Sequence, residues 1–379
     1  MALVLDEDQS LIQDTAREFC AERAPVAQLR ALRDQNDPLG YCADTWKEMV
    51  ELGWAGIIIP EAQGGSDFGW QALGIILEQT GRQLSASPLF ATVALGAGAV
   101  MLGGTDAMRS ELLPAIAEGR VTTALALEET SHHAPWGTAL TARADGDNFV
   151  LDGHKRFVLD GHSADVLIVV ARTAGKAGER DGLSLFCVPG DAAGVTRTRT
   201  RMADSRNAAN IDFAGVTVPA SALLGSRDAG ADVLDPLLDR ARICLAAEML
   251  GTAEEAFERT VAYLGERKQF GTLIGSFQAL KHRAADAYTE LHLARSTVMD
   301  ALTALDEGRD DIALVASLAK AKTCEVLNLV SREAVQMHGG VGMTDEFEIG
   351  FFLKRARIVE QAFGGAAFHR DRYAALSDY

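Results

Sequence analysis

The sequence predicts an α+β protein with several domains: an N-terminal helical domain, a central antiparallel β domain and a C-terminal four-helix bundle. Two observations lead to this prediction. The apolar periodicity changes from helical to strand-like near residue 121 and back again near residue 230, and the second helical part consists of long segments with short connections. At 379 residues, the chain is long enough to form two or three hydrophobic cores. The predicted domains are 1–120, 121–228 and 229–379.

The first predicted domain carries a series of helix signals. Acidic residues at positions 6–8 open a stretch whose apolar residues recur on one helical face. A second helix is predicted over 46–52, where Gly53 ends it, and apolar helices are predicted over 73–80 and 91–101.

The central domain is predicted from short apolar runs with turn signals between and beside them. The runs cover 148–151, 166–170 and 183–188, and the turn signals include Asp145-Gly146 and Asp160-Gly161. Such spacing is typical of an antiparallel sheet or a small barrel and disfavours parallel βαβ units.

The C-terminal bundle is predicted from four long segments with helical periodicity. They cover 234–266, 276–306, 310–338 and 348–362. Each of the three breaks between consecutive segments contains glycine. Long helices with short connections favour antiparallel neighbours in a bundle.

Composition excludes several classes of function. The formal charge of −17 argues against a general role at nucleic acids or membrane surfaces, although it leaves room for a local anion site. No apolar run approaches the roughly 20 residues of a membrane span, and the acidic N-terminus does not resemble a signal peptide, so a cytoplasmic location is expected. The five cysteines form no CxxC or Cys/His cluster, so no metal site is predicted.

Two polar, glycine-containing segments of the bundle have the chemistry to bind a dinucleotide. They are Arg267-Lys268-Gln269-Phe270-Gly271, which Gln278 follows, and Gln336-Met337-His338-Gly339-Gly340-Val341-Gly342. Arg267 can bind a pyrophosphate with two parallel hydrogen bonds, and the glycines allow a ligand to approach the backbone. No GxGxxG sequence opens a βαβ unit, so a Rossmann-type site is not supported. The alternative is that Arg267 and Gln278 cap and pair helix ends.

Together, these segments and the helical–β–helical order resemble the acyl-CoA dehydrogenase family over nearly the whole chain. Within it, the chain is similar to the smaller or divergent subunits of heteromeric bacterial members. The resemblance implies an acyl-CoA substrate, dehydrogenation between Cα and Cβ, and electron-transfer flavoprotein as a partner. It also implies that FAD binds across an interface with a homologous or identical subunit, to Arg267, Gln269, Phe270, Gln278, Gln336, Gly339 and Gly340.

The same resemblance shows that the sequence lacks the family's catalytic glutamate at its usual positions. The family places its catalytic glutamate at one of two positions, which in this sequence are Phe363 and Ala241. Two positions where family members offer hydroxyl groups to the flavin are Glu128 and Leu159 here, and a leucine donates no hydrogen bond. The chain is therefore expected to contribute to a partner's flavin site more readily than to complete its own.

Glu248 is the candidate replacement for the missing base. It lies in an apolar helical stretch, where an unpaired charge would be costly. The seven residues from Ala241 to Glu248 rotate the helix by about 700°, so both face nearly the same side, about 10 Å apart along the axis. Burial of a carboxyl group raises its pKa toward the range that suits a general base. The alternative is a structural ion pair with an arginine or lysine of another helix. Arg242 matches the family's arginine near the active site.

The expected function is FAD-dependent α,β-dehydrogenation of a bulky acyl-CoA by one subunit of a heteromeric complex, with Glu248 and Arg242 as the catalytic candidates. Two alternatives remain open. One is a non-catalytic family member that completes the flavin site of an active partner. The other is an oxygen-using flavoenzyme of the same fold.

Overall fold

The computed structural model describes residues 4–379. Its α-helices are α1 Glu7–Arg23, α2 Val26–Asp34, α3 Ala43–Glu51, α4 Gly69–Arg82, α5 Gly98–Gly103, α6 Asp106–Ala117, α7 Ala231–Glu266, α8 Gln278–Glu307, α9 Ile312–His338, α10 Ile349–Gln361 and α11 Ala366–Leu376. Its strands are β1 Thr123–Ala126, β2 Thr141–Asp145, β3 Asn148–Leu159, β4 Val166–Arg172, β5 Leu183–Pro189, β6 Val195–Arg199, β7 Ala208–Pro219, β8 Leu223–Leu224, β9 Lys268–Gln269 and β10 Thr272–Leu273.

The described chain forms two compact units, each built from separate stretches of sequence. One unit contains residues 4–31, 70–85 and 242–379, so α1 and α4 belong with the C-terminal helices. The other contains 32–69 and 86–241 and holds the large sheet. The domain boundaries at residues 120 and 228 stay a prediction.

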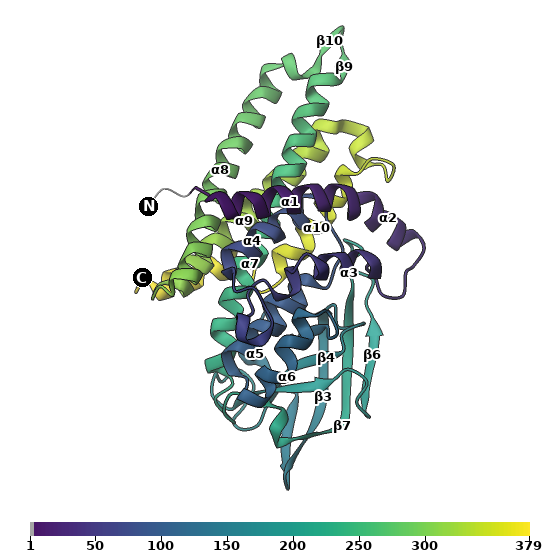
Figure 1. Cartoon of the computed structure of the whole chain (residues 1–379). Helices are drawn as coiled ribbons and strands as arrows, with labels where there is room; N and C mark the ends of the chain where they lie inside the picture. The colour runs from purple at the N-terminus through teal and green to yellow at the C-terminus, as the bar shows by residue number, and fades with distance from the viewer. Residues whose placement is uncertain (1–3) are drawn as a thin grey trace. The chain divides into compact units, whose positions relative to one another are not determined.

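The four predicted C-terminal helices are present as α7 to α10, with nearly the predicted bounds. Glycines end two of them, because the closing residue adopts a positive φ: Gly308 after α8 has a φ of 62° and Gly339 after α9 a φ of 66°. The two short strands β9 and β10 form a hairpin at the far end of α7 and α8 (Figure 1). This hairpin carries part of the first predicted flavin segment.

The strands of the central region form one sheet in the order β6-β7-β3-β2-β4-β5-β8, with β1 paired to β4. Most neighbours are antiparallel, as the short runs predicted. The pairing of β1 with β4 is parallel, with Thr123 opposite Val166, and this was not predicted. Apolar side chains of the strands, such as Leu151, Val169 and Phe186, form the core of this region.

The helix predicted over 73–80 is longer in the structure and begins at Gly69. Its first turn is capped by a side chain from another helix. The Asp306 carboxylate at the end of α8 accepts hydrogen bonds from the backbone N–H groups of Trp70 (2.6 Å) and Gln71 (2.9 Å). A carboxylate near a helix N-terminus pairs orphan donors and favours the helix dipole. Because Asp306 lies 236 positions from Trp70, the sequence near the start of α4 contains no sign of this cap.

Helices α4 and α7 touch backbone to backbone through a pair of glycines. A Cβ placed on Gly81 would lie 2.1 Å from the Glu248 carbonyl oxygen, and one on Gly251 would lie 1.9 Å from the Glu78 carbonyl oxygen. At this crossing the Thr252 hydroxyl donates to backbone carbonyl oxygens, with Oγ1 lying 3.1 Å from that of Gly81 and 2.9 Å from that of Glu248. The contact fixes the turn of α7 that bears Glu248 directly against α4.

Replacing Gly251 with alanine is therefore expected to lower the free energy of unfolding by about 1–3 kcal/mol, because the added methyl group has to separate two helices. Gly265 on the same helix is the matched control, since no atom lies within 4 Å of a Cβ there. Gly265→Ala is expected to stabilise the helix by about 0.5–1 kcal/mol. Urea unfolding of both variants measures the difference, and equal midpoints would contradict the contact.

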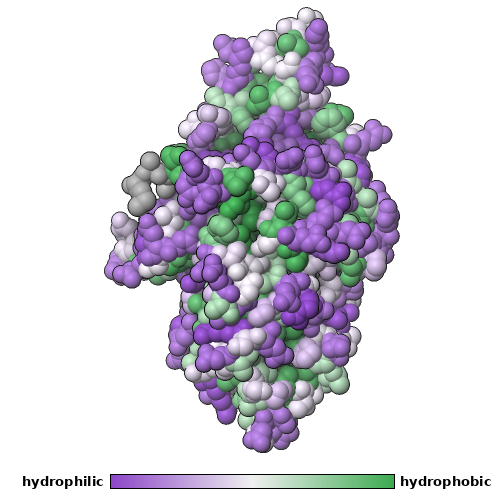
Figure 2. Space-filling view, viewed as in Figure 1, coloured by the Kyte–Doolittle hydropathy of each residue, from purple (hydrophilic) through white to green (hydrophobic). Residues whose placement is uncertain are grey.

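No helix of residues 4–379 combines the length and apolar character of a membrane span. On the face seen in Figure 2, hydrophilic residues cover much of the surface, with smaller hydrophobic patches between them.

Candidate functional site

The two predicted flavin segments meet at one end of the helical unit. The ring of Tyr263 on α7 stacks on that of His338 at the end of α9, with centroids 4.3 Å apart. Beside them, Leu264, Ile274 and Met337 form a small apolar cluster that joins the ends of α7, the β9–β10 hairpin and α9. These contacts fix Arg267 and the hairpin on one side and the glycines after α9 on the other.

The seven predicted cofactor residues are all exposed: Arg267, Gln269, Phe270, Gln278, Gln336, Gly339 and Gly340. Phe270 is 90% exposed and has a left-handed φ of 54°. A Cβ on Gly339 or Gly340 would meet no atom within 4 Å, so a ligand has access to the backbone there.

The groups at this end of the bundle fit a dinucleotide. The guanidinium of Arg267 has no hydrogen-bond or ion-pair partner among residues 4–379, so it does not cap or pair a helix end. Gln278 opens α8, whose N-cap residue Phe277 makes no side-chain cap, and the first-turn N–H groups of the helix favour an anion. A cation, amides and open backbone suit a pyrophosphate with polar groups on either side.

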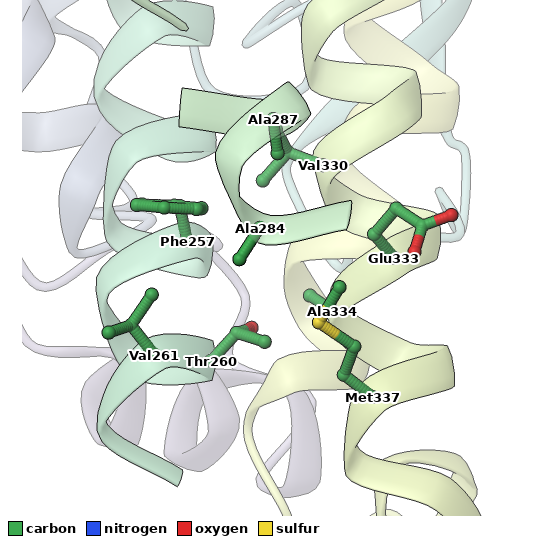
Figure 3. Close-up of a pocket in the computed structure, with 9 residues that line it drawn as sticks. All are labelled: Phe257, Thr260, Val261, Ala284, Ala287, Val330, Glu333, Ala334 and Met337. Atoms are coloured by element: carbon green, nitrogen blue, oxygen red, sulfur yellow. The ribbon is translucent and has the colours of Figure 1, made fainter. Parts of the chain in front are cut away.

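A crevice between α7, α8 and α9 lies near this end but is not the ligand site (Figure 3). Its walls are mostly apolar and include Phe257, Val330 and Met337. The space is about 10 Å³, hardly enough for a single water. The crevice is too small to hold a cofactor.

Glu248 is buried, with 3% of its surface exposed, and forms an ion pair with Arg355 of α10. The Nη2 and Nε atoms of Arg355 lie 2.6 Å and 3.0 Å from Oε1 of Glu248. The contact matches the alternative to a catalytic base, namely a structural ion pair between Glu248 and an arginine of another helix. The role of Glu248 as a base stays a prediction.

Sequence reasoning alone misjudges Arg355. It belongs to the run Lys354-Arg355-Ala356-Arg357, which reads most simply as a solvated helix face, yet it is only 7% exposed. The spacing contained a signal: Phe352 and Val359 lie three residues before and four after Arg355, so Arg355 is on the buried side of α10. An arginine on an apolar stripe indicates a buried acidic partner.

Arg242 is buried and contacts the residue that stands at the family's other base position. Its Nε donates a hydrogen bond of 3.2 Å to the carbonyl oxygen of Phe363. That carbonyl also accepts from Nε2 of His369 at 3.1 Å. Phe363 has a left-handed φ of 56°, and two donors hold this strained residue.

Lys320 holds the same corner from the side of α9. Its amine is completely buried and donates to the carbonyl oxygens of Val359 (3.1 Å), Glu360 (3.3 Å) and Gly364 (3.0 Å). No carboxylate among residues 4–379 pairs with it. Burial lowers the pKa of Lys320, and the carbonyls at the end of α10 offset part of the cost of its charge.

In the sheet unit, Glu128 is paired within its own loop. One carboxylate oxygen lies 2.5 Å from Nδ1 of His133, and the other accepts a hydrogen bond of 3.3 Å from the N–H of Ala134. Although His133 lies in a loop, only 3% of its side chain is exposed. Leu159 ends β3, opposite Ala208.

The neighbouring Glu129 anchors this loop to the sheet. It accepts hydrogen bonds from the buried amine of Lys155 (2.8 Å) and from the backbone N–H groups of Ala139 and Leu140. Burial lowers the pKa of Lys155 to about 8, although Glu129 opposes the shift. The sequence interpretation did not single out this pair, and alternation along β3 gave no sign that an inward position carries a charge.

Comparison with known proteins gives a consistent result over the whole chain. The acyl-CoA dehydrogenase N-terminal, middle and C-terminal domain families match residues 6–120, 124–216 and 228–376. A probable acyl-CoA dehydrogenase of Bacillus subtilis is 31% identical, over 98% of both chains. Among solved structures, a chain from the work on the electron transferring flavoprotein of Acidaminococcus fermentans has a TM-score of 0.91 at 29% identity, covering 99% of both chains. The Tcur3481–Tcur3483 steroid ACAD has a TM-score of 0.88 at 31% identity, covering 98% of both chains.

Proposed function

Because this chain belongs to the acyl-CoA dehydrogenase family, whose members are FAD-dependent oxidoreductases acting on CH–CH donors, we propose that it is one subunit of a heteromeric complex that dehydrogenates a bulky acyl-CoA. The partner in this proposal is a homologous chain, and electron-transfer flavoprotein reoxidises the complex in the cytoplasm.

The observation that carries the proposal is the exposure of the whole set of cofactor residues in a chain whose usual base positions hold no acid. Arg267 and the glycines Gly339 and Gly340 face away from their own chain. Groups so placed are open to a ligand held between this chain and a second subunit. Phe363 and Ala241 leave the reaction without a carboxylate at either family position.

In the proposed reaction, bound FAD would supply the acceptor for the hydride that leaves Cβ of the acyl chain. Glu248 removes the proton from Cα, since it is the buried carboxylate on the helix face shared with Ala241. Arg355 orients this carboxylate by binding Oε1 through two nitrogens. Arg267, Gln269, Phe270, Gln278, Gln336 and the two glycines bind the cofactor.

The acyl group is proposed to be branched, aromatic or steroidal. A base displaced by about 10 Å along α7 from the family's position suits a substrate whose Cα lies elsewhere in the site. The likeness to a steroid ACAD at 31% identity supports the same substrate class. A ligand-bound structure with a narrow, straight acyl tunnel would count against it.

The ion pair of Glu248 favours a second candidate function. A carboxylate engaged by Arg355 has a structural role whether or not it reacts. In the second candidate, this chain completes the flavin site of an active partner, and the partner supplies the base.

Isolation of the native assembly through a tag on this chain tests the proposal. We expect a second, homologous chain in the assembly and about half as many FAD molecules as chains. A homo-oligomer with one FAD per chain would overturn the heteromeric reading. Oxygen consumption on addition of acyl-CoA would point instead to an oxygen-using flavoenzyme.

The cofactor residues are tested in the same assembly. Arg267→Met is expected to weaken FAD binding at least about tenfold, because a charged hydrogen bond contributes about 1.5–3 kcal/mol. Arg143→Met is the control, since Arg143 is likewise an exposed arginine without a partner among residues 4–379. Equal FAD affinity of the two variants, measured by equilibrium dialysis, would remove Arg267 from the site.

A further inference from the structure

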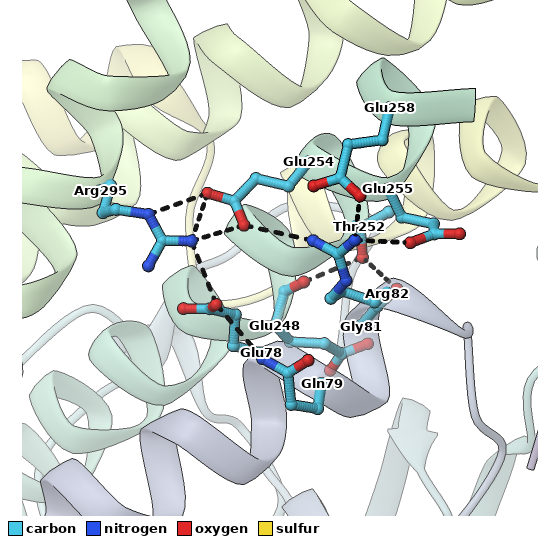
Figure 4. Close-up of polar contacts among 10 residues, drawn as sticks. All are labelled: Glu78, Gln79, Gly81, Arg82, Glu248, Thr252, Glu254, Glu255, Glu258 and Arg295. Carbon is cyan, nitrogen blue, oxygen red and sulfur yellow. Dashed lines mark hydrogen bonds and ion pairs between the residues drawn. The ribbon is translucent and has the colours of Figure 1, made fainter. Parts of the chain in front are cut away.

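A network of charges ties three helices together beside the turn that carries Glu248 (Figure 4). Its centre is Arg295 of α8, which reaches carboxylates on two other helices. Its Nη2 lies 2.5 Å from both carboxylate oxygens of Glu254 on α7 and 3.2 Å from Oε1 of Glu78 on α4. A single guanidinium therefore connects α4, α7 and α8.

A second arginine, on α4, pairs with carboxylates of α7. Arg82 at the end of α4 lies 3.5 Å from Oε2 of Glu254 and 2.9 Å from Oε2 of Glu255, and it also pairs with Glu258. The side chains of Arg82 and Glu254 are only 14% and 13% exposed, so water screens their interaction less than that of a surface pair.

The network acts on the segment that bears Glu248. Glu78 supplies the carbonyl against which Gly251 packs, and Gly81, one residue before Arg82, packs against the carbonyl of Glu248. Ion pairs on the side chains and glycine contacts on the backbone thus lie on the same two turns of α4 and α7. The ion pairs therefore lie beside the turn of α7 that carries Glu248.

Neighbouring charges of the network have opposing effects on the pKa of Glu254. Burial and the neighbouring Glu78 raise the pKa of Glu254 to about 7, although Arg295 and Arg82 oppose the shift. The charged groups around Glu254 are Glu78 and Arg82 of α4, Arg295 of α8, and Glu255 and Glu258 of α7 itself. Arg17 of α1 and His292 of α8 line the same hollow, which measures about 270 Å³.

We propose that Arg295 is a positioning residue for the reaction: through Glu78 and Glu254 it holds α4 and α8 against the turn of α7 that carries Glu248. This inference rests on the proposed role of Glu248 as the base. Arg295 itself touches neither substrate nor cofactor in this scheme, and it acts only through the placement of the carboxylate.

The test compares Arg295→Met with Lys322→Met in the FAD-loaded assembly. Lys322 is the matched control because it forms another interhelical ion pair, at 2.5 Å to Glu290, and its side chain is 21% exposed against 30% for Arg295. At saturating acyl-CoA, Arg295→Met is expected to slow flavin reduction about 10–100-fold, as a displacement of about 1 Å does. Its FAD content and KM change little, and Lys322→Met leaves the rate within about twofold.

Two further measurements separate positioning from general loss of structure. In the Glu248→Gln background, Arg295→Met is expected to slow the residual reaction no further, because both substitutions remove the same contribution. The Arg295→Met defect is also expected to be smaller at about pH 6 than at about pH 8. The pKa of Glu254 is about 7 with Arg295 in place and rises further without that guanidinium, so falling pH neutralises Glu254 in the variant and removes its repulsion of Glu78.

The outcomes distinguish this inference from the proposed function. An equal loss of rate from Arg295→Met with and without Glu248 would overturn the positioning role, even if Glu248 is the base. Full activity of Glu248→Gln would overturn the base, and the inference with it. A defect in Lys322→Met as large as that in Arg295→Met would show that any lost interhelical pair has the same effect.

Discussion

Replacing Glu248 with glutamine is expected to slow the reduction of bound FAD by acyl-CoA by at least about 100-fold. General acid–base catalysis contributes roughly 10²–10⁴-fold to a rate, and a glutamine side chain removes no proton at neutral pH. Stopped-flow bleaching of the flavin in a single turnover measures this step without interference from reoxidation. FAD content and substrate affinity are expected to change little, since Glu248 is placed at the proton and not at the cofactor.

The substitution retains an amide oxygen that accepts hydrogen bonds from Arg355 but leaves the arginine's charge unbalanced. A loss of stability of about 1–3 kcal/mol is expected from that alone. Circular dichroism at the assay temperature therefore accompanies the kinetics. A folded variant that bleaches at the wild-type rate removes Glu248 from the chemistry and leaves the carboxylate of the partner subunit as the base.

Breaking the buried pair from the other side is expected to have the largest effect on stability. Arg355→Met removes the guanidinium from a carboxylate that is only 3% exposed, and the free energy of unfolding is expected to fall by about 3–5 kcal/mol. The double variant Glu248→Met with Arg355→Met replaces both charges by apolar groups and is expected to regain most of this loss. Chemical denaturation of the wild type, the two single variants and the double variant gives the coupling free energy.

The two measurements answer different questions about the same residue. A stable but inactive double variant means that Glu248 reacts and that the pair is not needed for folding. A stable and active one means that neither Glu248 nor Arg355 is needed for the reaction. Additive losses in the two single variants, with no recovery in the double variant, would contradict a direct interaction between the two side chains.

Much of the fold could be predicted from the sequence because its signals are local. Helical periodicity and closing glycines such as Gly308 and Gly339 marked α7 to α10. Turn signals marked the sheet strands, although the parallel pairing of β1 with β4 depends on contacts that no short segment encodes. The cofactor segments were found by their residue types, and the contact of Tyr263 with His338 that joins them was not.

The charged contacts of the interior were less predictable, since each depends on residues far apart in the sequence. Glu248 and Arg355 are 107 positions apart, and apolar surroundings identified Glu248 as unusual without naming its partner. The fully buried Lys320 lies two residues from Lys322, which is partly exposed and paired with Glu290. Only the position of Lys320 on the buried stripe of α9 distinguishes the two.

The amine of Lys320 has a consequence for the motion of the chain around Phe363. Any opening of the corner between α10 and α11 would expose three carbonyl groups and strip a buried cation of its only oxygen ligands among residues 4–379. Such an opening is costly, and backbone amides there exchange slowly with solvent when opening is rare. The corner between α10 and α11 is therefore expected to stay closed while the less tightly bonded ends of the helices open.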